Sequence, residues 1–87
     1  MAETNKSTLI LTPGLVSGRI ALVNSAGRFV IVSFPPGAMP ALERRLNVYR
    51  GGLKVAEIRI TGPQRDLNTA ADILAGECQV GDDARED

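Results

Sequence analysis

The chain has 87 residues, of which 44% are apolar, and its ten basic side chains balance ten acidic ones. This predicts one folded domain with a modest core, because a chain of this size buries only about 60–65% of its unfolded surface. Histidine is absent and Cys78 is the only cysteine, which excludes Ser-His and Cys-His catalysis, an intrachain disulfide, and zinc sites built from cysteine pairs or histidine.

Residues 1–14 are interpreted as a flexible leader, in which residues 8–12 are a candidate for a short added strand, and residues 15–87 as the folded domain. The leader lacks the charged-then-apolar order of a signal peptide, and no segment has the roughly 18–20 apolar residues needed to span a bilayer. We therefore expect no membrane span and a cytoplasmic location for the chain as given. If the sequence is part of a longer protein, the expectation changes to association with the cell envelope.

Two strands are predicted over residues 18–23 and 28–34, with a turn at 24–27 and a stop at Pro35-Pro36-Gly37. The second strand is apolar on both faces. We expect Val30, Val32 and Phe34 to fill the core, and Phe29 and Ile31 to point outward, where a polar face would be usual. Either residues 9–11 or another chain would then cover this outer face, and a charge-poor strand at a sheet edge would invite pairing with a second chain.

Residues 39–44 are compatible with one helical turn or with an irregular crossing. The next signal is stronger: two alternating runs, 46–50 and 53–60, flank Gly51-Gly52, which suits the positive φ angles of a primed hairpin turn. Ala56, Ile58 and Ile60 share the predicted inner face, and Thr61-Gly62-Pro63 is expected to end the strand.

Residues 66–77 fit a helix nearly as well as a strand, because Leu67, Ala71 and Leu74 have helical spacing. The turn signals around them favour a strand over 69–75, followed by a turn at 80–83 and a short last strand. The sequence thus predicts an all-β fold, a small antiparallel barrel of five or six strands.

Residues 45–61, RLNVYRGGLKVAEIRIT, resemble the pattern lxVyRxGxxvGxixVt of small bacterial β-barrel domains. Such domains are carried by the rod-shape protein MreC and by the C-terminal part of the flagellar protein FlgT. Residues 71–74, Gly81-Asp82 and the hairpin from residue 18 to 34 extend the resemblance, while Ala56 stands where relatives often have glycine. The resemblance implies an SH3-like barrel used for assembly, supports a strand over 69–75, and carries over no catalytic residues.

Charge is distributed unevenly along the chain. Residues 18–65 hold eight basic and two acidic side chains, whereas residues 66–87 hold one basic and seven acidic side chains. The basic part indicates either binding to an anionic partner or pairing with the acidic C-terminal segment. We favour the second, in which this segment folds back on the basic strands of its own chain or meets those of a neighbouring chain. Ordinary solvated faces would also give this pattern. The carboxylates at 82, 83, 86 and 87 are expected to form a solvated tail rather than an acid–base pair.

These observations predict a non-catalytic protein-interaction or assembly module that needs no cofactor or metal and self-associates through the apolar strand. The candidate contact residues are Phe29, Ile31, Tyr49 and Arg50; for the last two, simple surface alternation is an equal alternative. The second hypothesis is a binder of nucleic acid or an anionic envelope polymer through the Arg-rich strands, although three aromatic residues make nucleic-acid binding unfavourable. Cys78 is expected to be inert or partly buried, with a thiol pKa raised by the adjacent Glu77.

Overall fold

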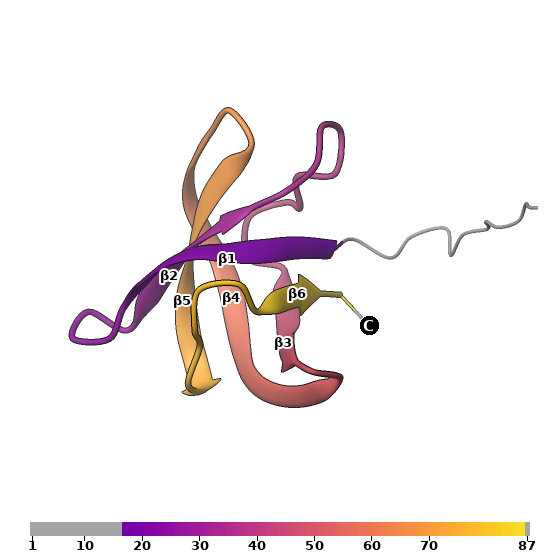
Figure 1. Ribbon diagram of the computed structural model, residues 1–87. Helices are drawn as coiled ribbons and strands as arrows, with labels where there is room; N and C mark the ends of the chain where they lie inside the picture. Colours follow the sequence, from indigo (N-terminus) through magenta and orange to yellow (C-terminus); the bar gives the residue numbers. More distant parts are fainter. Residues whose placement is uncertain (1–16, 87) are drawn as a thin grey trace, which may run out of the picture.

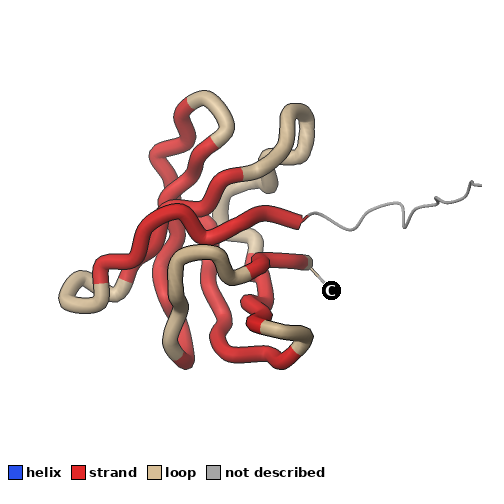
Figure 2. The backbone as a smooth tube through the Cα atoms, in the orientation of Figure 1, coloured by secondary structure: helices blue, strands red, loops and turns tan. Residues whose placement is uncertain are grey.

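A computed structural model describes residues 17–86, which form six β-strands and no helix (Figures 1 and 2). The predicted leader, residues 1–14 with the candidate strand at 8–12, lies outside these residues. The strands are β1 (Ser17–Asn24), β2 (Phe29–Ser33), β3 (Arg45–Arg50), β4 (Leu53–Arg65), β5 (Asn68–Gly76) and β6 (Asp83–Arg85). The predicted all-β class is therefore confirmed.

The strands close into an antiparallel barrel in the order β1-β2-β5-β4-β3-β6, and β6 pairs back onto β1. Strands β3, β4 and β5 follow one another through two hairpins, and β6 returns to lie beside β3. This 6-3-4-5 arrangement is a Greek key. Strand β2 likewise pairs with β5 rather than with β3, the strand that follows it in the chain.

One residue in two along each strand fills the barrel, as the alternation predicts. Val30, Val32 and Phe34 are buried, whereas Phe29 and Ile31 are only half-buried on the outside, so the predicted faces of β2 are confirmed. The core is completed by Ile20, Leu46, Val48, Ala56, Ile58, Ile60, Ala71, Ile73, Cys78 and Ala84. Gly18 is required by this packing, because a Cβ there would lie 2.6 Å from the Phe34 ring.

The β3–β4 hairpin turns at Gly51 and Gly52, with φ angles of 60° and 83°, as predicted for a primed turn. The prediction that Thr61-Gly62-Pro63 ends the return strand is wrong. Strand β4 continues to Arg65, because the register with β5 shifts between Ile60 and Gln64. A proline is tolerated in a strand at such a bulge, where its missing N–H breaks no ladder bond.

Two ambiguous segments are resolved by the structure. Residues 39–44 form an irregular crossing without a helical turn, held by a hydrogen bond from the Glu43 N–H to the Ile60 carbonyl at 2.7 Å. Residues 68–76 form strand β5 rather than a helix, with a two-residue turn at Asp66 and Leu67. Here pairing with β2 and β4 overrides the helical spacing of the apolar residues.

The acidic C-terminal segment is part of the barrel. The expectation of a solvated tail is wrong for Asp82 and Glu86, whose side chains are 4% and 16% exposed. Strand β6 pairs with β1 and β3 at once. Four ion pairs join the segment to basic residues: Arg59–Asp72 at 3.5 Å, Arg19–Asp83 at 3.6 Å, Arg44–Glu86 at 2.6 Å and Arg50–Asp82 at 2.9 Å. The segment thus folds back on the basic strands, as favoured from the charge distribution.

Candidate functional site

The outer face of β2 carries an apolar row that crosses three neighbouring strands. Ile31 lies directly opposite Leu22 of β1 and opposite Ala70 of β5. Leu22 is 48% exposed, and Phe29 and Ile31 are each half-buried. Cross-strand neighbours on one face have Cβ atoms about 4.5–5.5 Å apart, so Leu22, Ile31 and Ala70 form one continuous apolar surface.

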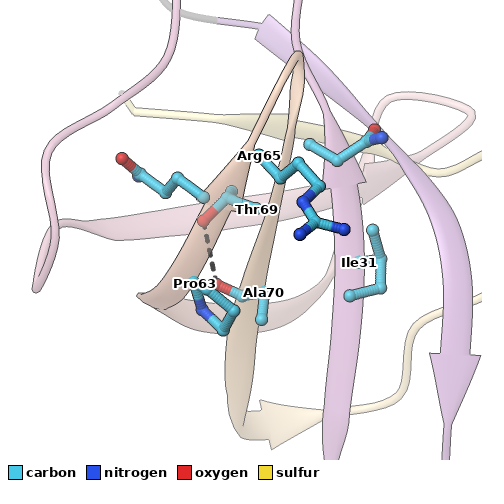
Figure 3. A pocket seen from close by; sticks show the side chains of 7 residues that line it. Ile31, Pro63, Arg65, Thr69 and Ala70 are labelled. Carbon is cyan, nitrogen blue, oxygen red and sulfur yellow. Dashed lines mark hydrogen bonds between the residues drawn. The ribbon is translucent and has the colours of Figure 1, made fainter.

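A groove of about 500 Å³ lies beside this row, between β2 and the end of the β4–β5 hairpin. We call it the outer groove, and it is lined by Ile31, Pro63, Gln64, Arg65, Asn68, Thr69 and Ala70. Figure 3 shows Ile31 on one side, Pro63 and Ala70 on the other, and the Arg65 side chain extending between them.

The outer groove results from the shape of β4 and from one small residue. The bulge between Ile60 and Gln64 displaces the chain before it pairs again with β5, where Gln64 is opposite Thr69. Ala70, which faces outward between Ile31 and this displaced segment, has only a methyl group to fill the space. The Gln64 side-chain amide donates a hydrogen bond to the Pro40 carbonyl at 2.8 Å, which fixes the displaced segment to the β2–β3 connection.

Arg65 gives this apolar groove a positive charge. Five of the basic side chains between residues 17 and 86 form ion pairs, at Arg19, Arg44, Arg50, Lys54 and Arg59. Arg65 forms no ion pair with another described residue, and neither does its neighbour Asp66, which is exposed in the turn. The groove therefore combines apolar side chains with a guanidinium that is available to an anion.

The four contact residues predicted from the sequence do not form one site. Phe29 and Ile31 lie on β2, whereas Tyr49 and Arg50 lie on β3, and two strands separate β2 from β3 in either direction around the barrel. Tyr49 stacks under the guanidinium of Arg85, with 4.0 Å between the guanidinium carbon and the ring centroid. A single contact surface that included the residues of both strands would have to extend around the barrel.

The side chain of Arg50 forms an ion pair with Asp82 of the same barrel. Its Nε and Nη2 atoms donate to Oδ1 and Oδ2 of Asp82, each at 2.9 Å, and the Gln79 N–H donates to Oδ2 at 2.7 Å. The bond from Arg50 lowers the pKa of Asp82, although burial acts in the opposite direction. Arg50 is thus a ligand of a buried carboxylate, which accounts for its position without an external partner.

Cys78 is buried, as the sequence indicated, beside a cavity of about 280 Å³ lined also by Val23, Ser25, Arg28, Ile73 and Glu77. Burial raises the pKa of the thiol, and Asp82 raises it further, whereas Arg50 and Arg28 lower it. The expected cause, the adjacent Glu77, is not among these. The thiol is consequently a poor nucleophile, since the thiolate is the reactive form.

Between residues 17 and 86, no group of histidine, cysteine or carboxylate side chains is arranged to hold a metal ion. In the same residues, no helix has the length and apolar character that a transmembrane span requires.

Sequence reasoning identified Ile31 but missed Pro63, Arg65 and Ala70. Pro63 was interpreted as a strand terminator, and Arg65 as one charge among many in a basic region. Ala70 and Ala71 are adjacent and identical, yet one faces the outer groove and the other the core. Only the register with β2 shows which alanine faces outward. The sole signal of the outer groove in the sequence is Pro63, which follows a long alternating run.

The chain is a small closed β-barrel with an apolar outer groove that contains one charged side chain, Arg65. A comparison of the chain with protein-family models, curated proteins and solved structures finds no match. The resemblance to the MreC and FlgT domains, with the SH3-like topology that it implies, stays a prediction.

Proposed function

We propose that this barrel is a non-catalytic assembly module that self-associates through the outer groove and the apolar row beside it. The observation that carries the proposal is the row of Leu22, Ile31 and Ala70, in which Leu22 is 48% exposed and the other two side chains are half-buried. Apolar surface removed from water contributes about 25 cal/mol per Å². A contiguous apolar surface of this kind, bordered by polar residues, is typical of a protein contact site.

Contact through side chains fits the barrel better than addition of a strand. The sequence predicted strand-mediated docking if residues 29–34 lay at a sheet edge, but β2 is paired on both sides, with β1 and with β5. Its backbone N–H and C=O groups therefore have partners already. A second chain would meet the outward side chains of β2 and β5 instead.

The alternative, a binder of nucleic acid or of an anionic envelope polymer, is less well supported. The ion pairs named above neutralise most of the basic side chains that would bind a polyanion. The outer groove also contains no aromatic side chain on which a base would stack. A polyanion complex would weaken steeply with salt, whereas an apolar contact between copies would not.

The test is the solution mass by light scattering, across a range of protein concentrations, at low and at high salt. We expect the mass to rise with protein concentration in both conditions. An Ile31→Asp variant should remain a monomer up to a concentration at least tenfold higher than that at which the wild type associates. Leu53→Asp is the matched control, because Leu53 is 70% exposed at the β3–β4 turn, away from the outer groove. A wild-type mass that stays at one chain throughout, or equal effects of the two variants, would contradict the proposal.

A further inference from the structure

The β4–β5 turn is both a wall of the outer groove and a projection from the barrel. Figure 1 shows it as the orange loop at one end of the molecule. It consists of Asp66 and Leu67, flanked by the pair Arg65 and Asn68. Leu67 is 43% exposed, while its carbonyl accepts a hydrogen bond from the Phe34 N–H at 2.8 Å. An exposed leucine and carboxylate are thus presented on an anchored backbone.

The outer groove fits a ligand of the same chemistry. Ile31, Pro63 and Ala70 provide apolar contacts for one aliphatic side chain, and Arg65 provides a guanidinium for an adjacent carboxylate. Guanidinium groups bind carboxylates with paired, charge-assisted hydrogen bonds. The ligand that the groove favours is therefore an extended or turn segment with an acidic residue next to an aliphatic one.

Two exposed leucines of the barrel have an acidic neighbour, and only one of these acids forms no ion pair with a described residue. Glu43 follows Leu42, but its carboxylate lies 3.8 Å from Arg59, and Leu42 lies against Gly62. Asp66 precedes Leu67 and forms no ion pair with another described residue. Among the described residues, the β4–β5 turn is thus the segment whose charge and apolar side chain complement the outer groove.

We infer that the β4–β5 turn of a second copy occupies the outer groove, with Leu67 of the second copy on Ile31 and Ala70, and its Asp66 paired with Arg65. This inference rests on the proposed function and specifies the contact. A two-fold axis beside the turn makes the contact reciprocal, because each copy then presents its turn to the groove of the other. Every dimer contains two Arg65–Asp66 pairs and two inserted leucines.

The reciprocal arrangement gives a charge-exchange test by sedimentation velocity. Arg65→Asp places acidic residues on both sides of each contact, and Asp66→Arg places basic residues on both sides. We expect each variant alone to associate at least tenfold more weakly than the wild type, because like charges then face each other. An equimolar mixture of the two should form a heterodimer, since each contact again joins opposite charges.

Arg45→Asp is the matched control: it changes charge equally on β3, where Arg45 also forms no ion pair with a described residue, and should leave the association unchanged. Thermal unfolding of each variant shows whether it folds. If Asp66→Arg does not, Asp66→Asn removes the charge with a residue that tolerates the φ of 56° at this position, and weaker association is again expected.

Two outcomes separate this inference from the proposed function. If the wild type associates and either variant associates equally well, or if the mixture does not recover, the turn is not the occupant, while self-association through the outer face remains. If the wild type is a monomer at every concentration, both are wrong.

Discussion

Replacement of Asp82 by asparagine tests whether the acidic segment is held in the barrel by its buried carboxylate. Asp82 accepts two hydrogen bonds from Arg50 and one from the backbone of Gln79. Asparagine has nearly the same shape but no charge, and it offers one acceptor oxygen instead of two. Its amide nitrogen would then face a guanidinium N–H, which places two donors together.

The expected loss follows from the burial of the acceptor and the exposure of its partner. A hydrogen bond to a charged group contributes about 1.5–3 kcal/mol, and solvent screening at Arg50, which is 40% exposed, favours the lower part of this range. The bond from Gln79 survives in the variant. We therefore expect the free energy of unfolding to fall by about 2 kcal/mol, which lowers the melting temperature by about 8–16 °C in a domain of this size.

Urea unfolding followed by far-ultraviolet circular dichroism measures this loss, and the adjacent residue supplies a control. Asp83 is 52% exposed and lies 3.6 Å from Arg19, so Asp83→Asn should cost less than about 0.5 kcal/mol. The pKa of Asp82 is lowered in the folded state, so its contribution is complete above the ordinary value of about 3.9 and disappears as the pH falls further. The gap between wild type and Asp82→Asn should thus shrink below about pH 4. Equal losses for both variants at neutral pH would refute the assignment of the stabilising role to Asp82.

Two further experiments test the backbone at the glycine positions and the burial of Cys78. Gly76→Ala should destabilise the barrel by about 3 kcal/mol or more, because the new Cβ would clash with the Val55 carbonyl oxygen. Gly37→Ala, at the same φ of 79° and with no atom within 4 Å, should cost about 1–2 kcal/mol. Similar losses in urea unfolding would show that the clash is absent. Cys78 should react with iodoacetamide at least about tenfold more slowly in the folded chain than in urea, because burial removes access and raises the thiol pKa. Equal rates would place the thiol at the surface.

The strands were predictable because their pattern is local. The alternation of residues 53–60 and the pair Gly51-Gly52 specify a hairpin without reference to the rest of the chain. The end of β4 was not predictable in this way. Gly62 and Pro63 normally end a strand, and here they stay within it because β5 pairs on both sides of the bulge.

The outer groove and the buried ion pair depend on contacts that are distant in sequence. Arg50 meets Asp82 across 32 positions, through a strand order that the alternation does not determine. The sequence indicated that the acidic segment folds back, but not which carboxylate becomes buried. In the same way, it identified Ile31 as outward-facing, while Ala70 and Pro63 became part of a site only through the pairing of β2, β5 and β4.

A dilution series of nitrogen-15 amide spectra tests most directly whether the outer groove is the contact surface between copies. The unmodified chain is used, so no variant can confuse loss of folding with loss of contact. We expect concentration-dependent shifts at Ile31, at residues 65–70 and at their cross-strand neighbours, with the amides of the β3–β4 turn unchanged. Spectra that are identical at all concentrations, or shifts that gather around Tyr49 and Leu53, would contradict this location.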